Sequence, residues 1–333
     1  MRSSILMDRF HEIDLKPSEH YSKYLEMLEN DVSDLLINRL NKTRSCPACN
    51  SQKTKDAFRK FGMTYHECSD CGTLFISPYP SNEDVLRFYE EAPAEKFWRN
   101  QLAKIAEDKR EQKIILPRIE WILEAAQEYL SGIPNAVAFL DSPELGYAKF
   151  VNKKINNIYF IRPFVSEEAL NGYPSLNILS SLDELPESLD LITLFETLDH
   201  IPETQDFLAK VYKALKPGGL CFVTSILSSG INILLLREHA SNIYPPDRLN
   251  VFSVEGLKQL FDKFGFEVLE FSTPGILDME ILQRTVPQNP DLPEIRFIKY
   301  LLENRDEGVH QSFQQFLQIS LMSSYGRILL RKS

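Results

Sequence analysis

The stretch Leu189–Leu227, LDLITLFETLDHIPETQDFLAKVYKALKPGGLCFVTSIL, decides the fold of this chain. Residues 190–195 form a short apolar run, which is typical of a strand buried on both faces. Residues 207–215 repeat apolar side chains at helical spacing, and the Lys-Pro-Gly-Gly sequence at 216–219 ends that helix. Residues 220–224 form a second apolar run. A strand, a helix and a strand in this order predict a right-handed crossover in a parallel sheet.

Similar apolar runs on both sides extend this unit into a doubly wound α/β domain. A helix is expected over residues 254–264, with Ser253 as its cap and Gly265 at its end. The tail from residue 292 is expected to be helical and to finish in one more edge strand at residues 327–331. The remaining expected strands are at residues 136–141, 158–161, 176–179 and 266–271.

The composition excludes several classes of protein. The chain has 333 residues, of which 43% are hydrophobic, and a formal net charge of −10. The acidic balance argues against general nucleic-acid binding, which needs a basic footprint. The N-terminus lacks the apolar core of a secretory signal, and no apolar run approaches the ~20 residues that span a membrane. We therefore expect a cytoplasmic protein whose partner is a small molecule or another protein.

Four of the cysteines form two C-x₂-C pairs. Cys46 and Cys49 are separated from Cys68 and Cys71 by eighteen residues, a spacing that is typical of a four-cysteine zinc ribbon. Four thiolates close a tetrahedral shell and leave no open position, so we expect a structural zinc ion. Iron is the chemical alternative in the same cage, and two disulfides are disfavoured in a cytoplasmic chain. His66 is left out because the shell is already complete.

These features divide the chain into five segments. We predict an N-terminal helical segment, a zinc ribbon, a helical bridge, an α/β domain and a helical tail with the edge strand, at residues 1–43, 44–80, 81–130, 131–290 and 291–333 respectively.

The motif DLITLFETLDHI, followed by a helix and LKPGGLCFVTS, resembles the second half of class I S-adenosylmethionine-dependent methyltransferases. The resemblance covers roughly residues 119–275. It implies a Rossmann-like, mostly parallel methyltransferase sheet and methyl transfer from S-adenosylmethionine. A zinc ribbon ahead of such a domain resembles a group of bacterial methyltransferases, some of which act on nucleotide-linked sugars. This second resemblance implies a small-molecule acceptor, sugar-linked ones included.

The resemblance places the cofactor at the ends of the first strands, where the chain departs from the family pattern. Instead of Asp/Glu-x-Gly-x-Gly-x-Gly the sequence reads DSPELGY, which keeps Asp141 but only one glycine, Gly146. Arg162 stands where an acidic residue usually accepts hydrogen bonds from the ribose, and a guanidinium is donor-only. The other cofactor-binding candidates are Tyr147, Ser181, Asp183 and Phe195.

Three explanations of this departure remain open. The chain is a methyltransferase with an altered cofactor pose, or it is a methyltransferase-like binding or scaffolding protein that has lost the cofactor. In the third, the alignment is shifted by a residue or two, so that Glu144 or Asp183 serves instead. Arg162 would also suit an anionic ligand, such as a phosphate or a carboxylate.

On the acceptor side, His200 follows the fourth strand, where ligands gather in such folds. An imidazole titrates near neutrality, which makes His200 the candidate general base, with a purely structural role as the alternative. The Pro-rich stretch at residues 242–250 resembles an acceptor lid. Its candidates for acceptor binding are Tyr244, Arg248 and Asn250, and the alternative is that they only shape the lid.

Overall fold

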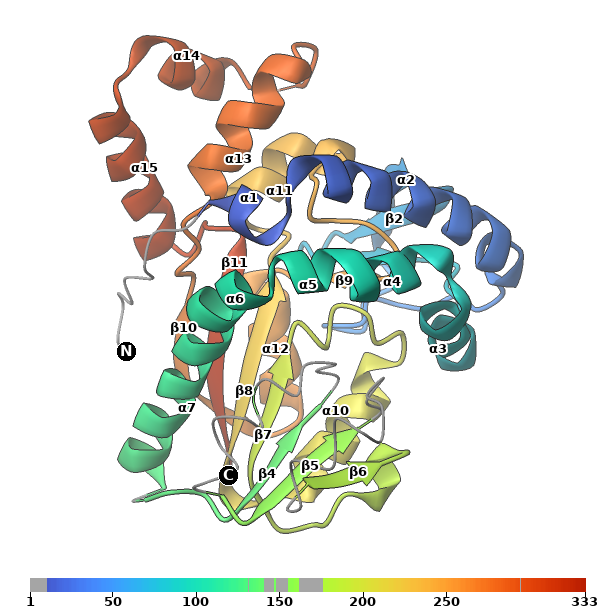
Figure 1. Ribbon diagram of the computed structural model, residues 1–333, viewed down its shortest axis with the longest axis vertical. Coiled ribbons are helices and arrows are strands. Elements are labelled where there is room, and N and C mark those ends of the chain that lie inside the picture. Colours follow the sequence, from blue (N-terminus) through green and yellow to red (C-terminus); the bar gives the residue numbers. More distant parts are fainter. Residues whose placement is uncertain (1–10, 131, 141–146, 148–154, 162–175, 294) are drawn as a thin grey trace.

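Two β-sheets and the helices around them make up the structure, a computed structural model (Figure 1). It describes residues 11–130, 132–140, 147, 155–161, 176–293 and 295–333. The predicted cofactor residues Asp141, Gly146 and Arg162, and the alternative Glu144, lie outside these ranges.

The larger sheet is doubly wound, and this confirms the predicted fold class. Its strands run in the order β10-β11-β8-β7-β4-β5-β6. The neighbouring strands from β8 to β6 pair in parallel, and β11 is antiparallel to both of its neighbours. The strands are β4 (Ala136–Phe139), β5 (Asn157–Ile161), β6 (Leu176–Leu179), β7 (Leu189–Phe195), β8 (Leu215–Ile226), β10 (Phe266–Ser272) and β11 (Tyr325–Lys332).

The predicted edge strand at the C-terminus is wrong in its position. β11 lies inside the sheet, between β10 and β8, so that β10 and β6 form the two edges. Ile328, Leu329 and Leu330 are fully buried. Three successive apolar residues suit a strand covered on both faces, because neighbouring side chains point to opposite sides of a sheet.

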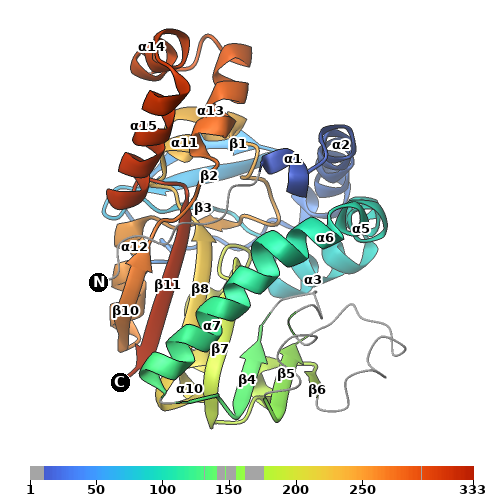
Figure 2. The ribbon, with the colours of Figure 1, turned by 60° about the vertical axis from the view of Figure 1, so that its left-hand side comes forward.

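Helices cover both faces of this sheet. α10 (Thr204–Ala214) and α12 (Val254–Lys263) pack on one face, and α7 (Leu116–Tyr129) packs on the other, as Figure 2 shows. Ser253 caps α12 as predicted, since its hydroxyl accepts a hydrogen bond of 2.8 Å from the Gly256 N–H. In the sequence, α7 precedes the first strand of this sheet, whereas α10 and α12 lie between later strands.

The smaller sheet joins the cysteine ribbon to the lid. β1 (Thr54–Lys60), β2 (Met63–Cys68) and β3 (Leu74–Ile76) are antiparallel neighbours. The fourth strand, β9 (Asn250–Val251), comes from the segment that we assigned to the α/β domain, and it pairs with β3. The ribbon therefore shares a sheet with the predicted acceptor lid.

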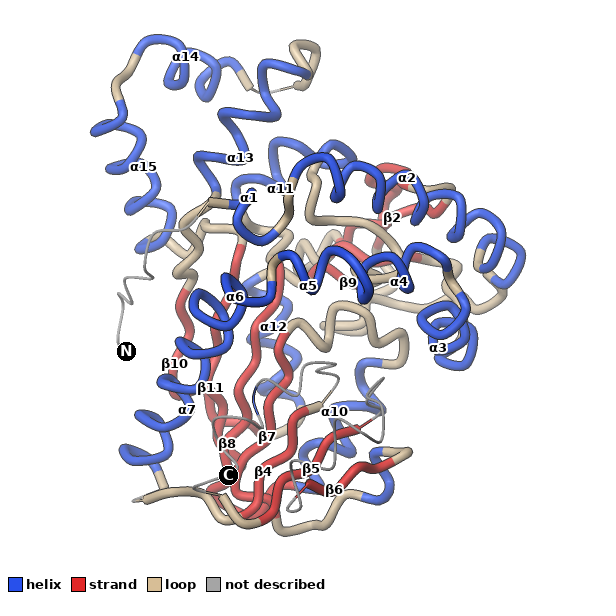
Figure 3. The backbone as a smooth tube through the Cα atoms, viewed as in Figure 1, coloured by secondary structure: helices blue, strands red, loops and turns tan. Residues whose placement is uncertain are grey.

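The remaining helices lie above the larger sheet and around the smaller one (Figure 3). They are α1 (Glu12–Leu15), α2 (Ser18–Leu35), α3 (Asn82–Glu91), α4 (Pro93–Phe97), α5 (Ala103–Ile105), α6 (Glu107–Arg110), α11 (Ile231–Leu236), α13 (Asp278–Thr285), α14 (Arg296–Asn304) and α15 (Glu307–Ile319), with short 3₁₀ or π turns at Ile37–Arg39, Trp98–Leu102, Glu111–Ile115, Leu182–Glu184, Arg237–His239 and Val286–Gln288. Besides the two hydrophobic cores on the faces of the larger sheet, a further core lies between these helices, the ribbon and the lid.

Arg44 connects the ribbon with two other parts of the chain. Its guanidinium donates hydrogen bonds to the carbonyl oxygens of Ile76 (3.1 Å), Pro202 (2.7 Å) and Leu249 (3.0 Å). The same group lies over the Tyr79 ring, 4.7 Å from its centroid. Arg44 thus holds the loop after β7 and the end of the lid against the ribbon.

We expect Arg44→Met to lower the free energy of unfolding by about 2–4 kcal/mol, because it removes three hydrogen bonds from a guanidinium group to backbone carbonyl oxygens. Urea unfolding would measure this change. Arg59→Met is the matched control, since Arg59 is exposed and donates only to the nearby Gly62 carbonyl oxygen. Equal stability losses in the two variants would contradict the assigned role of Arg44.

Candidate functional site

The ends of four neighbouring parallel strands open into one large cavity. Leu140 follows β4, Ile161 ends β5, Ser181 follows β6 and Phe195 ends β7, and all four line a cavity of about 990 Å³. This volume is typical of a site for a small organic molecule. The cavity lies where the strand order reverses, beside β4, which is the usual ligand position in open α/β sheets.

Three of the predicted cofactor residues come together here. The Tyr147 ring is buried and stacks on Phe139, with 5.1 Å between the ring centroids. It also lies 5.5 Å from the Phe195 ring. Ser181 lines the same cavity, and its hydroxyl accepts a hydrogen bond of 3.2 Å from the Asp183 N–H. Tyr147, Phe195 and Ser181 therefore form one wall of the cavity.

Asp183 does not join this group. Its side chain is exposed and accepts a 2.8 Å hydrogen bond from the Lys210 ammonium, which lowers the pKa of the carboxyl group. The side chain lies outside the lining of the cavity, so the alternative in which Asp183 replaces the missing acidic residue does not fit. The short 3₁₀ turn Leu182–Glu184 directs it to solvent instead.

Glu196, which the sequence analysis missed, is the central charged residue of the site. It follows β7 directly, with a left-handed φ of 59°. Its carboxylate accepts a hydrogen bond of 3.0 Å from Arg118 and pairs with Arg248 on its other oxygen. Burial alone would raise its pKa, but the two guanidinium groups outweigh burial and lower the pKa to about 2. Glu196 is therefore ionised throughout the physiological pH range.

Arg248 is held by carboxylates on two sides. Besides Glu196 it faces Asp199, with 3.5 Å between Nε and the nearer carboxylate oxygen. Asp199 is fully buried, and its carboxylate also accepts hydrogen bonds from the Ser225 hydroxyl and the Ile226 N–H. Burial raises the pKa of Asp199 to about 7, although Arg248 and Ser225 oppose the shift. Because two carboxylates already pair with it, Arg248 fixes the lid to the sheet.

The far end of the cavity is acidic and aromatic. His200 lines the cavity, with its ring 6.1 Å from that of Tyr89. The Tyr89 hydroxyl donates a 2.8 Å hydrogen bond to Asp247. Glu95, on α4, is buried and accepts a 3.1 Å hydrogen bond from the Tyr24 hydroxyl. Of the lid candidates, Tyr244 also lines this end.

Asn250 does not fit the prediction of acceptor binding. It is fully buried, and its amide N–H₂ donates to the carbonyl oxygens of Leu198 (2.8 Å) and Ile201 (2.9 Å). Its own N–H donates to the Asp199 carbonyl oxygen at 2.8 Å. Asn250 is outside the cavity lining and instead fixes the loop that carries His200.

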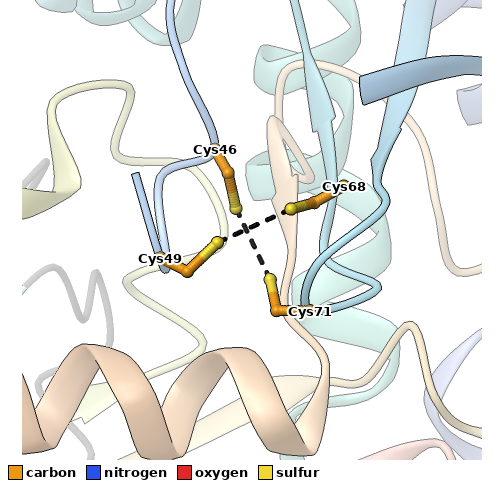
Figure 4. A group of neighbouring side chains, drawn as sticks. All are labelled: Cys46, Cys49, Cys68 and Cys71. Atoms are coloured by element: carbon orange, nitrogen blue, oxygen red, sulfur yellow. Dashed lines mark hydrogen bonds between the residues drawn. The ribbon is translucent and has the colours of Figure 1, made fainter. Parts of the chain in front are cut away.

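The four predicted cysteines meet at one point (Figure 4). Their sulfur atoms all lie within 4.8 Å of one another, with 3.6 Å between Cys46 and Cys71 and 3.5 Å between Cys49 and Cys68. A tetrahedral zinc ion with bonds of about 2.3 Å needs sulfur–sulfur distances of about 3.8 Å. The donor set therefore fits a four-thiolate metal site. His66 is engaged elsewhere, with its Nε2 2.7 Å from the Ser77 carbonyl oxygen.

The cysteine ribbon supports the cavity directly. The Tyr65 hydroxyl on β2 donates a 2.6 Å hydrogen bond to the Arg248 carbonyl oxygen. From the other side, the Ser228 hydroxyl donates a 2.8 Å hydrogen bond to the Gly72 carbonyl oxygen. The ribbon is therefore hydrogen-bonded to the lid through β2 and to the loop after β8 through its second cysteine turn, so that it is part of the framework of the site.

A cavity at the switch point of a doubly wound sheet defines a Rossmann-like ligand-binding domain. Residues 117–271, slightly less than half of the chain, match the family described as methyltransferase domain, and this match supports the resemblance to class I S-adenosylmethionine-dependent methyltransferases. In the described ranges, no helix is long and apolar enough to cross a membrane.

The individual similarities are distant. Ubiquinone biosynthesis O-methyltransferase of Pseudomonas putida (strain W619) is 33% identical over 54 residues, which cover 16% of this chain and 23% of that protein. The chain thus spans about a quarter of the length of this relative. Coclaurine N-methyltransferase, bound to N-methylheliamine and SAH, aligns at 15% identity over 64% of this chain and 70% of its own, with a TM-score of 0.38. The plantazolicin methyltransferase BamL aligns at 13% identity over 71% and 92%, with a TM-score of 0.43.

The buried carboxyl group of Glu95 predicts a pH-dependent stability. Burial and, to a smaller extent, the charge of Asp247 raise its pKa to about 8, against the hydrogen bond from Tyr24 and the charge of Arg99. An unfolded chain releases this proton near its ordinary pKa of 4.5. Between these two values the folded state binds more protons, so the contribution of Glu95 to stability falls as the pH rises.

We expect Glu95→Gln to remove this loss. The stability of the variant relative to the natural protein should increase by about 1–3 kcal/mol between about pH 5 and about pH 8. Urea unfolding at the two pH values would measure this difference. The raised pKa of Asp199 also makes stability depend on pH, but it does so equally in the natural protein and in the variant. The exposed Glu91→Gln is the control, with a pH-independent difference expected. The same constant difference for Glu95→Gln would show that Glu95 is not protonated in the folded state.

Proposed function

We propose that the protein transfers a methyl group from S-adenosylmethionine to a small-molecule acceptor, sugar-linked acceptors included, inside the cavity at the ends of β4 to β7. The observation that carries this proposal is that four strand ends of a methyltransferase domain line one cavity large enough for two small organic molecules.

The described residues fit the cofactor. Leu140, Ile161 and Phe195 offer apolar walls for a flat adenine ring, and the Ser181 hydroxyl lies at the same end of the cavity. When bound, S-adenosylmethionine supplies a sulfonium methyl group that a nucleophile can displace in line. We propose Tyr147 and Asp141 as further cofactor contacts, the latter from its place in the sequence motif alone. Gly146 and Arg162 remain candidates on the same ground.

The residues of the chain have the tasks of positioning the acceptor, excluding water and accepting a proton. An in-line displacement depends mainly on the alignment of the two reactants. Tyr244 and Tyr89 wall the acceptor end, and the framework of Arg248 with its two carboxylates holds the lid closed over it. We propose His200, which lines the same cavity end, as the proton acceptor.

We also propose that Cys46, Cys49, Cys68 and Cys71 hold a structural zinc ion. The convergence of their sulfur atoms supports a four-thiolate shell. Such a shell has no open position for a substrate, so the metal would stabilise the ribbon rather than take part in methyl transfer.

Calorimetric titration with S-adenosylmethionine and S-adenosylhomocysteine tests the main proposal. We expect micromolar dissociation constants, weakened at least tenfold by Asp141→Ala, because hydrogen bonds to a carboxylate contribute about 1.5–3 kcal/mol. Asp183→Ala is the matched control: this carboxylate is exposed and outside the cavity, so the affinity should not change.

Two outcomes would change the conclusion. No binding of either compound at millimolar concentration would favour a methyltransferase-like binding or scaffolding protein. A loss of affinity in Asp183→Ala but not in Asp141→Ala would mean that the sequence motif is aligned incorrectly.

For the metal, we expect one zinc ion per chain, measured by elemental analysis of the purified protein. Cys46→Ser should lose the ion and several kcal/mol of stability, because metal binding and folding of a ribbon are coupled. Cys221→Ala is the control, since Cys221 lies in β8 and outside the cluster, and should keep the ion. Retention of zinc by Cys46→Ser would refute the four-cysteine site, and iron in place of zinc would correct the identity of the metal.

A further inference from the structure

A second cavity adjoins the first. It measures about 470 Å³ and lies between α7, the ends of β10 and β11, and the helices α1 and α13. Figure 2 shows α7 crossing in front of the middle of the larger sheet, with β10 and β11 to its left. Arg118 and Glu196 line both cavities, so this ion pair stands between them. The volume is again in the range of sites for small organic ligands.

Several buried polar atoms around this cavity lack hydrogen-bond partners among the described residues. Trp121 lines it and is only 4% exposed, and its indole N–H has no hydrogen-bond partner among the described residues. The buried Nε of Arg327 and the amide oxygen of the fully buried Asn232 also lack partners in the described ranges. Because a buried polar atom without a partner is costly, native proteins rarely contain several in one place.

Arg327 is arranged so that the edge of its guanidinium remains available. The group stacks on the Trp121 ring, 3.9 Å from the ring centroid, and this contact occupies its face. Sheet pairing places Arg327 opposite Ser272 and thus one diagonal step from Glu270, which lines the same cavity. Within the described residues, however, no ion pair joins Arg327 to Glu270.

We propose that this second cavity binds a small organic anion, with its carboxylate or phosphate group on Arg327 and Trp121. A guanidinium presents its N–H groups in a fork that matches the oxygens of such anions, and the indole N–H adds a donor. Apolar side chains, among them Ile276, Leu277 and Ile281, also line the cavity and suit the organic part of the ligand.

The other charged groups of the cavity narrow the class of ligand. Three exposed glutamates of α7, Glu120, Glu124 and Glu128, line it, and Lys16 and Lys113 belong to the same lining. Because the glutamates outnumber these lysines, a bare inorganic ion would bind weakly, and apolar contact must contribute to affinity. The proposal does not depend on methyl transfer, since none of the atoms that carry it belongs to the predicted cofactor wall.

Tryptophan fluorescence gives a direct test. The chain has two tryptophans, so that Trp98→Phe leaves Trp121 as the single reporter. The probes are phenyl phosphate, benzoate and inorganic phosphate. We expect a saturable change in emission with the two organic anions at millimolar concentration and a much weaker response to inorganic phosphate. Isothermal calorimetry on the natural protein provides a second readout of the same affinities.

Substitutions then locate the probe. Arg327→Gln should weaken both organic probes at least tenfold, whereas Arg331→Gln, on the same strand but exposed and paired with Glu267, should not. Arg327→Lys keeps the charge without the planar fork and should bind with intermediate affinity. Glu270→Gln should strengthen binding, because it removes a negative charge close to Arg327.

The proposal fails if neither organic probe saturates up to about 10 mM, or if Arg327→Gln binds them as the natural protein does. Weaker binding by Glu270→Gln, with an unchanged melting temperature, would overturn the choice of an anion. If Arg327→Gln does not fold, an affinity of Arg327→Lys equal to that of the natural protein refutes the role of the fork. These results are independent of S-adenosylmethionine binding, which the titrations of Asp141→Ala address.

Discussion

The ion pairs of Glu196 are the constraint on which the site depends. Its carboxylate lies at the end of the central strand β7 and joins Arg118 of α7 to Arg248 of the lid. With Asp199 this makes two carboxylates and two guanidinium groups, of which Asp199 is fully buried and Glu196 half-buried. Removing one member of such a group leaves an uncompensated buried charge, at a cost of about 3–5 kcal/mol. The left-handed backbone conformation of Glu196 also costs free energy, but less, and the ion pairs with Arg118 and Arg248 offset it.

The ribbon and the α/β domain are one framework. The sequence divides them at residue 80, but β9 from the lid completes the ribbon sheet. Arg44 and Tyr65 donate hydrogen bonds to two neighbouring carbonyl oxygens of the lid, those of Leu249 and Arg248. A metal that folds the ribbon would therefore also shape the acceptor end of the cavity. The closed four-thiolate shell alone would indicate only a structural role within the ribbon. This coupling follows from backbone hydrogen bonds, which carry no signal in the sequence.

Sequence patterns predicted those features of the fold that depend on neighbouring residues. Apolar runs located the strands, the Lys-Pro-Gly-Gly turn located the crossover, and the spacing of the cysteines predicted their convergence. The place of β11 could not be predicted, because strand order is set by contacts between distant segments. Glu196 had one available signal, its position directly after a buried strand. Arg118 and Glu95 had no such signal, since they lie on helices that are far from β7 in the sequence and reach the cavities only in the folded chain. Asn250 is polar and near the site, yet its bonds are internal.

The charges of the two cavities favour different groups in a ligand. At the proposed acceptor end of the larger cavity, Arg248 is already paired with Glu196 and Asp199, and Asp247 lines the open volume. An anionic group would be repelled there, so a neutral or cationic acceptor group fits better. The guanidinium of Arg327, whose Nε has no hydrogen-bond partner among the described residues, lies beyond the Arg118–Glu196 pair, in the smaller cavity. The two cavities therefore separate opposite charge preferences by one ion pair, and this separation would select against ligands whose anionic group lies beside the reacting atom.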